Sequence, residues 1–204
     1  MEKLLCKEKL QPEYIHSDVT LKEEMALKPV EGLMTKIVRF SFEKKPFKCV
    51  AGGYAAYVDN RTFRYDDIDV FRTPLPTTSR RSHNYPDSTI LKVIDKKPYQ
   101  MIYTVYKDED SIQSFMEKVL SSFDLQECCV AYGYEFLPVP KFVKCTRKID
   151  YTKEKILSLS HKRMKKYNQR SKTVPTLKWL SLTIAKETFE KADLQDYITS
   201  VVLF

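Results

Sequence analysis

Two short stretches of the sequence decide the fold, Val50-Ala51-Gly52-Gly53-Tyr54-Ala55-Ala56 and Tyr65-Asp66-Asp67-Ile68-Asp69-Val70-Phe71. The run Phe47–Ala51 is apolar and β-prone, which predicts a strand that stops at a tight turn formed by the two glycines. The small residues after the glycines predict a short helix, whose N-terminus would favour a phosphate together with the backbone N–H groups of the turn. The second stretch predicts the next strand.

That second strand carries two carboxylates on one face. Asp67 and Asp69 are two residues apart, so their side chains point to the same side, while Ile68 and Val70 point to the other side. Neighbouring carboxylates repel each other unless a cation lies between them, and hard oxygen ligands suit Mg²⁺ or Mn²⁺. Taken alone, each stretch also fits a simpler interpretation, a plain turn and an edge strand with charges facing water.

Together and in this order, the two stretches resemble the signature of the DNA polymerase β-like nucleotidyltransferase superfamily. That family has a third acid on a later strand, and its best match is Asp124 in Ser122-Phe123-Asp124-Leu125, with Glu127 in reserve. The run Arg163-Met164-Lys165-Lys166-Tyr167-Asn168-Gln169-Arg170 resembles an Arg-x-x-Lys-Tyr-x-x-Arg helix of a small eukaryotic and viral subset. The resemblance spans residues 47–172.

The resemblance implies roles for individual residues. Three acids would be catalytic and would hold two Mg²⁺ or Mn²⁺ ions: Asp67, Asp69 and Asp124. The residues expected to bind the nucleotide are Gly52, Gly53, Tyr54, Arg163, Lys166, Tyr167 and Arg170. The last four share one helix face by their spacing, and such a face suits a triphosphate or a nucleic-acid backbone. Packing inside the domain is the competing interpretation of Tyr54 and Tyr57.

The positive charge of the chain is concentrated in one segment. The 204 residues have a formal net charge of +8, with 43% hydrophobic and 30% charged residues, which is typical of a globular protein. Between Lys141 and Lys172 there are twelve basic residues and two acidic ones, a net charge of +10 that leaves −2 for the remainder. This distribution predicts an anionic partner. Together with the resemblance, it implies a nucleoside triphosphate and a nucleic acid bound through residues 141–172.

The sequence also bears on location. No apolar run approaches the length of a membrane span, and the N-terminal residues lack the apolar core of a signal peptide. The five cysteines are odd in number and have no CxxC spacing, which indicates buried thiols in a reducing compartment. We therefore expect a cytoplasmic or nuclear protein with no membrane partner; nothing in the sequence sets an oligomeric state.

The remaining pattern predicts a mixed α/β domain of the α+β kind, a small nucleotidyltransferase-like sheet flanked by helices. A helix over 18–38 is expected to use the apolar positions Leu21, Met25, Leu33 and Ile37 and to be interrupted near Pro29. The other expected elements are strands at 89–94, 99–106 and 125–134, a turn at 95–98, a loop at 72–88, and helices at 109–120, 152–171 and within 176–203.

Two parts of the chain follow from this pattern. Residues 1–140 would form the catalytic core with its N-terminal helix, and residues 141–204 a short, basic, helical part packed on it. The leading hypothesis is an Mg²⁺-dependent nucleotidyltransferase that moves a nucleoside monophosphate from a triphosphate to an acceptor hydroxyl, on RNA or another nucleic acid. The alternative is a catalytically inactive protein of this fold that binds nucleic acid or acts as a scaffold.

Overall fold

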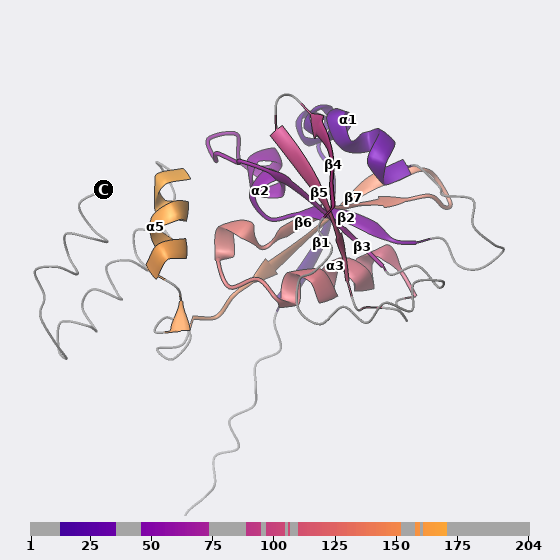
Figure 1. Ribbon diagram of the computed structural model, residues 1–204. Coiled ribbons are helices and arrows are strands. Elements are labelled where there is room, and N and C mark those ends of the chain that lie inside the picture. The colour runs from indigo at the N-terminus through magenta and orange to yellow at the C-terminus, as the bar shows by residue number, and fades with distance from the viewer. Residues whose placement is uncertain are drawn as a thin grey trace, which may run out of the picture.

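A single mixed sheet forms the centre of the molecule. The computed structural model describes residues 13–35, 46–73, 89–94, 97–104, 106, 110–151, 158–159 and 161–170. Seven strands lie in the order β1-β7-β6-β2-β3-β5-β4 (Figure 1). They are β1 (Glu13–Asp18), β2 (Lys48–Ala51), β3 (Ile68–Arg72), β4 (Thr89–Ile94), β5 (Lys97–Tyr103), β6 (Val130–Glu135) and β7 (Lys141–Lys148). Strands β3 and β5 pair in parallel, and the other pairs are antiparallel.

Helices cover both faces of this sheet, as Figure 1 shows with α1 and α2 above it and α3 below. The described helices are α1 (Leu21–Thr35), α2 (Gly53–Asp59), α3 (Ile112–Ser121) and α5 (His161–Arg170), with a 3₁₀ turn, η1 (Gln126–Cys128). One buried cluster joins α1, α2 and Met164 of α5 to the upper face, and a second joins α3 to the lower face. The predicted mixed α/β class is therefore confirmed.

Helix α3 follows its sequence pattern closely. Ser111 caps its N-terminus by accepting the Ser114 backbone N–H at 3.1 Å. Its apolar stripe is buried against the sheet, with Phe115, Met116 and Leu120 completely inaccessible. The prediction of a helix over 109–120 is confirmed, because spacing and burial agree here.

Helix α1 differs from its prediction in its start, its continuity and part of its buried face, and residues 36–38 of the predicted helix lie outside the described residues. It starts at a capping box, in which the Thr20 backbone N–H donates to Glu23 Oε2 at 2.8 Å and the Glu23 N–H to Thr20 Oγ1 at 3.3 Å. It continues through Pro29 without a break. Leu21 and Met25 are 74% and 65% exposed, so the predicted apolar face was wrong at these two positions; Leu33 packs against the core as predicted, and Ile37 lies outside the described residues. The buried residues are Glu23, Ala26, Leu27, Val30 and Met34.

The segment predicted as one strand over 125–134 is two elements. Residues Gln126–Cys128 form η1, and β6 starts only at Val130. Asp124 therefore does not open a strand; it precedes the 3₁₀ turn. The Tyr151 hydroxyl holds this corner, because it donates to the Asp124 carbonyl at 2.9 Å and accepts the Gln126 backbone N–H at the same distance.

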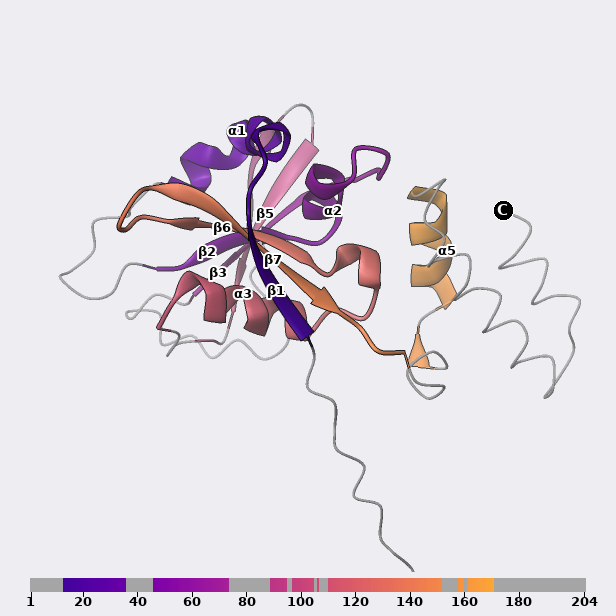
Figure 2. The same ribbon diagram turned by 180° about the vertical axis from the view of Figure 1, so that it is seen from behind.

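The predicted boundary at residue 140 falls inside the β6–β7 hairpin. Strand β7 continues the core sheet and pairs with both β6 and β1 (Figure 2). The first residues of the predicted helical part are therefore a strand, since Phe142, Val143 and Cys145 are buried against the two faces. Strand β1 had no counterpart in the sequence prediction.

Other predictions are confirmed in part or lie outside the described residues. Strands β4 and β5 form the expected antiparallel hairpin, but Lys97 and Pro98 belong to β5 and not to the turn. Helix α5 covers the second half of the helix predicted over 152–171. The loop at 74–88 and the helices within 176–203 lie outside the described residues.

Strand β7 also places two cations of the basic segment inside the fold. Lys144 Nζ contacts Glu23 Oε1 at 2.8 Å and Asp59 Oδ1 at 2.5 Å, and Glu23 Oε1 also accepts the buried Tyr132 hydroxyl at 2.7 Å. Arg147 donates to the backbone carbonyls at the end of α3. The +10 segment is therefore not one continuous binding face.

The Glu23–Lys144 pair predicts sensitivity to acid. Burial raises the pKa of Glu23, but hydrogen bonds from Lys144, Thr20 and Tyr132 outweigh it and hold this pKa at about 2. Because the folded pKa lies below the unfolded one, Glu23 stabilises the fold above about pH 4.5 and loses this contribution as pH falls towards 2, on the order of 3 kcal/mol. Urea unfolding at pH 7 and pH 3 measures it. Glu23→Gln should be less stable at pH 7 and lose less on acidification; an equal acid loss in both proteins would contradict the assignment.

Candidate functional site

The glycine turn lies between a carboxylate and a guanidinium. Gly52 has φ of +82° and begins α2, a backbone conformation that favours glycine. A Cβ on Gly52 would lie 3.4 Å from Asp69 Oδ2, and a Cβ on Gly53 would lie 3.5 Å from Arg170 Nη1. The predicted strand, turn and short helix are confirmed, and two of the predicted site residues contact the turn.

Strand pairing brings Asp69 to the turn. Asp69 lies opposite Ala51 in the β2–β3 register, one residue before the glycine pair. Burial first, and then the Asp67 carboxylate, raise the pKa of Asp69, whereas Lys166 and Arg170 lower it; together they leave this pKa at about 6. Even with two cations nearby, the pKa of the Asp69 carboxyl stays well above its ordinary value. An additional cation at the site would therefore be favourable.

Helix α5 supplies those cations. Its buried residue Met164 packs into the upper cluster, which holds the helix beside α2 and η1. Arg170 is buried, forms an ion pair with Asp66, and accepts the Arg64 backbone N–H through its carbonyl at 3.0 Å. Lys166 is exposed and acts on Asp69 through its charge. The helix therefore presents Lys166 and Arg170 to Asp69 on β3 and Arg170 to Asp66 just before it.

Tyr167 has a packing role in this arrangement. Its ring lies 5.7 Å from the Arg163 guanidinium and 5.2 Å from that of Arg170, and 6.1 Å from the ring of Phe63. Burial raises the pKa of its hydroxyl, as does a contact with Cys128. Tyr167 thus orients the two arginines, and its shared face with them agrees with the helical spacing.

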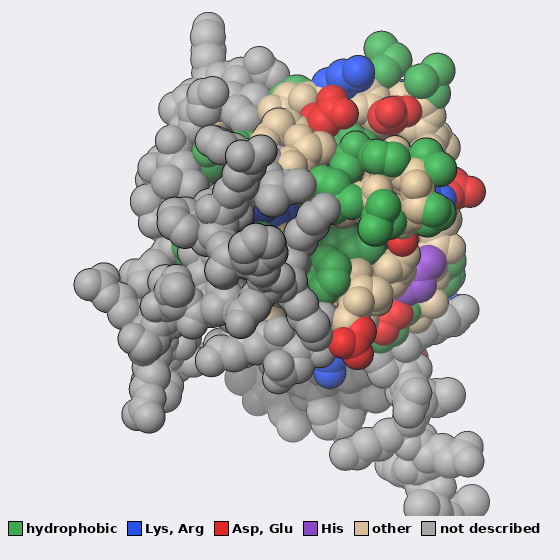
Figure 3. All heavy atoms as spheres, turned by 90° about the vertical axis from the view of Figure 1, so that its right-hand side faces the viewer, with side chains coloured by type: hydrophobic (Ala, Val, Ile, Leu, Met, Phe, Trp, Pro, Cys, Tyr) green, Lys and Arg blue, Asp and Glu red, His purple; other side chains and the backbone are tan. Residues whose placement is uncertain are grey.

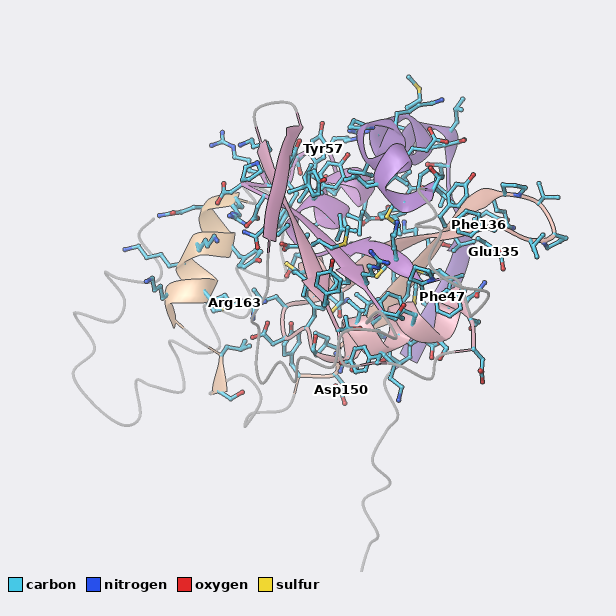
Figure 4. The ribbon with its side chains drawn as sticks, turned by 45° about the vertical axis from the view of Figure 1, so that its right-hand side comes forward. Phe47, Tyr57, Glu135, Phe136, Asp150 and Arg163 are labelled. Atoms are coloured by element: carbon cyan, nitrogen blue, oxygen red, sulfur yellow. The ribbon has the colours of Figure 1, made fainter. Side chains whose placement is uncertain are left out.

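The third predicted acid does not join the other two. Asp124 forms an ion pair with Arg163, with Nη1 and Oδ1 2.8 Å apart. Figure 4 shows Arg163 on α5. Among the described residues no three His, Cys, Asp or Glu side chains are grouped so that they could hold a metal ion. Asp124 is thus paired with an arginine in this structure.

Glu127, the reserve candidate, is a buried carboxylate on η1. Burial raises its pKa, and neither carboxylate oxygen has a hydrogen-bond partner in the described part of the chain. Tyr54, predicted to bind nucleotide, lies in the core: its side chain is 2% exposed and its hydroxyl donates to the Ala26 carbonyl at 2.5 Å. Only the backbone of Tyr54 is thus near the turn, and the packing interpretation of its ring agrees with the structure.

Two contributors to the site were missed by sequence reasoning. Asp66, to which the sequence assigned no role in the site, forms an ion pair with Arg170. Phe123 lies against the turn, with its Cε1 3.6 Å from the position of a Cβ on Gly52, and packs edge-to-face on Phe71. The only available signal was proximity in sequence, since each is adjacent to a predicted acid.

The carboxylate pair fits a divalent cation by its chemistry. Two hard oxygen ligands, Asp69 on β3 and Asp67 just before it, are close enough for the Asp67 charge to act on Asp69, whose pKa is raised by burial and by this neighbour. A bound Mg²⁺ or Mn²⁺ would relieve the repulsion that raises this pKa. Asp67 and Asp69 are the residues that would hold it.

A separate hollow of about 500 Å³ lies at the side of the molecule away from α5. Met34, Phe47, Phe136 and Leu137 contribute to its apolar lining, and Figure 3 shows hydrophobic side chains gathered on this face. None of the residues predicted for the site lines it.

No protein-family model matches the chain, and no curated protein matches its sequence. Within the described part of the chain, no helix has both the length and the apolar character that crossing a membrane requires. The functional argument therefore depends on the geometry of the site itself.

Proposed function

We propose that this protein is an Mg²⁺-dependent nucleotidyltransferase that moves a nucleoside monophosphate from a triphosphate to an acceptor hydroxyl, on RNA or another nucleic acid. One observation carries the proposal: the glycine turn lies between Asp69 and Arg170, so closely that a Cβ on Gly52 would contact the carboxylate and a Cβ on Gly53 the guanidinium. A phosphate chain at the turn would meet carboxylates for a cation and a guanidinium for its own charge.

In this proposal the residues have distinct tasks. Asp67 and Asp69 hold the divalent ion, which when bound polarises the phosphate and neutralises the leaving pyrophosphate. Arg170, fixed by Asp66 and packed on Tyr167, orients the triphosphate at Gly53. Lys166 extends into solvent, where it can meet phosphate oxygens farther out. Asp124 serves as the third carboxylate only when its ion pair with Arg163 opens.

The test measures transfer of labelled nucleoside monophosphate to a mixed nucleic-acid acceptor, with Mg²⁺ and with chelator. We expect transfer by the unchanged chain, and a loss of at least about 100-fold for Asp67→Asn, because one of the two ligands becomes neutral. Asp18→Asn is the matched control, since its carboxylate is 93% exposed and lies on β1. Equal transfer by Asp67→Asn, or transfer that survives the chelator, would overturn the metal assignment.

The second candidate is a non-catalytic nucleic-acid-binding protein. The Asp124–Arg163 ion pair favours it, because this pair neutralises the acid that catalysis would need as a third ligand. Binding of nucleic acid that persists without Mg²⁺ and in Asp67→Asn, with no transfer by any form of the protein, would favour this candidate. Both proposals include a cytoplasmic or nuclear location for the protein.

A further inference from the structure

A second group of cations and aromatic rings lies beside the site, outside the basic segment 141–172. It comprises Tyr57 on α2, Arg61, Arg64 and Tyr65 in the connection to β3, and Lys97 at the start of β5. We call these five residues the tyrosine surface. The proposed reaction gives none of them a task.

The two rings of this surface are held in place by aromatic contacts. The ring centroids of Tyr57 and Tyr65 are 4.9 Å apart, and Tyr65 is 5.0 Å from the buried ring of Tyr54. The Arg61 guanidinium lies 4.8 Å from the centre of the Tyr57 ring, and Lys97 Nζ lies 5.6 Å from that of Tyr65. Each ring therefore has a cation over its face, at the distances of cation–π pairs.

The tyrosine surface adjoins the proposed site directly. A Cβ on Gly53 would lie 3.7 Å from Tyr65 Cβ, and the Arg64 backbone N–H donates to the Arg170 carbonyl at 3.0 Å. Since β3 and β5 are parallel, Lys97 begins β5 at the same end of the sheet where Asp67 precedes β3. A strand of nucleic acid on this surface would thus have one end at the carboxylates.

The charge of the surface is suited to phosphates. Arg64 is exposed, and Tyr57, Arg61, Tyr65 and Lys97 are half-buried. The nearest acid along α2, Asp59, is paired with Lys144, so it does not cancel these cations. In Figure 4, Tyr57 and Arg163 both lie to the left of the apolar residues Phe47 and Phe136, away from the separate hollow.

We propose that the tyrosine surface binds single-stranded nucleic acid, with bases stacked on the ring–cation pairs Tyr57–Arg61 and Tyr65–Lys97 and phosphates on Arg61, Arg64 and Lys97. Stacking on aromatic rings next to cations is how proteins hold single strands without reading sequence. Paired bases in a duplex have no free face for such rings. That the bound nucleic acid is the acceptor of the reaction rests on the proposed function. That the surface binds nucleic acid does not depend on it.

The experiment measures binding of short fluorescent oligouridylate and oligothymidylate to the full chain by anisotropy, over a range of salt concentrations. Tyr57→Leu removes one stacking ring and should weaken binding by about 5- to 150-fold. Arg64→Gln/Lys97→Gln should lower the slope of log affinity against log salt by about 1.4, because each phosphate contact on a single strand contributes about 0.7. A difference between the two oligonucleotides would tell RNA from DNA.

The matched control is Lys28→Gln/Lys118→Gln, which removes the same charge from exposed positions on α1 and α3. It should leave the salt slope unchanged. If Tyr57→Leu does not fold, the double variant Arg64→Gln/Lys97→Gln still decides the question. Binding that both sets of variants leave unchanged, or equal competition by duplex or by inorganic polyphosphate, would overturn the proposal.

Nucleotide transfer is measured separately on the same proteins. Asp67→Asn should lose transfer and keep oligonucleotide affinity. No transfer by any form of the protein, combined with oligonucleotide binding that the tyrosine-surface variants weaken, would overturn the proposed reaction and support the surface. Normal transfer, combined with oligonucleotide binding that these variants leave unchanged, would support the proposed reaction and overturn the proposed binding surface.

Discussion

Asp69→Asn is expected to abolish Mg²⁺-dependent nucleotide transfer and at the same time to make the metal-free protein more stable at pH 8. Both effects come from one carboxylate that is buried and repelled by its neighbour. Burial first, and then Asp67, raise the pKa of Asp69 to about 6 from an ordinary value of 3.8. Keeping this group ionised at pH 8 therefore costs folding free energy unless a cation is bound.

The direction of the pH dependence follows from the raised pKa. Between about pH 4 and pH 6 the folded chain binds a proton at Asp69 that the unfolded chain has lost, so stability falls as pH rises through this range. The shift corresponds to up to about 3 kcal/mol. Asp69→Asn carries no such charge, so its free energy of unfolding at pH 8 should exceed that of the unchanged chain.

Chemical unfolding at pH 5 and pH 8, with and without Mg²⁺, measures both effects. Mg²⁺ should stabilise the unchanged chain at pH 8, because a ligand that binds only the folded state shifts the equilibrium, and should leave Asp69→Asn unchanged. Asp18→Asn, at an exposed position, should behave like the unchanged chain throughout. A destabilised Asp69→Asn at pH 8, or one that still transfers nucleotide, would refute the carboxylate-pair assignment.

The centre of the candidate site could be predicted because its determinants are local. The glycine pair ends a strand of four buried residues, and Asp69 lies on the neighbouring strand, opposite Ala51. Helix α3 could be predicted for the same reason, since its buried stripe follows the helical period. In both cases spacing within one element decides where a side chain points.

The errors come from contacts between residues far apart in sequence. Glu23 is buried on α1 because Lys144 on β7 and Tyr132 on β6 satisfy it, so hydropathy assigned the wrong face to the helix. Lys144 also explains why β7 was not predicted: basic residues alternate with apolar ones there, and the segment was interpreted as part of a basic helical region. A prediction that uses only the spacing of apolar residues cannot detect a buried ion pair.

The third acid was the hardest residue to place. The apolar run after Asp124 predicted a strand that begins at this residue, but η1 intervenes and changes where its carboxylate points. Its partner Arg163 lies on α5, a helix whose docking depends on the burial of Met164. No local pattern near Asp124 predicts its ion pair with Arg163. The sequence could therefore identify the acid as a candidate but could not identify its partner.

Gly133→Ala is expected to cause the largest loss of stability from a single added methyl group. A Cβ at this position on β6 would lie 2.5 Å from Ile112 Cγ1, 2.8 Å from its Cδ1 and 3.1 Å from Met116 Sδ. Because both side chains are buried between α3 and the sheet, the helix itself must shift. We expect a loss of about 1–3 kcal/mol, the usual cost of overpacking.

A double-mutant cycle separates this clash from other effects. Ile112→Ala alone opens a cavity and should cost about 2–5 kcal/mol, but combined with Gly133→Ala it should cost less than the sum, since the new methyl group occupies part of the cavity. Gly32→Ala is the matched control: its Cβ would meet nothing within 4 Å, so it should stabilise α1 by about 1 kcal/mol. Urea unfolding measures all four variants. Additive losses in the cycle would show that the close packing of α3 on β6 does not require glycine at position 133. The position of α3 would then need another explanation.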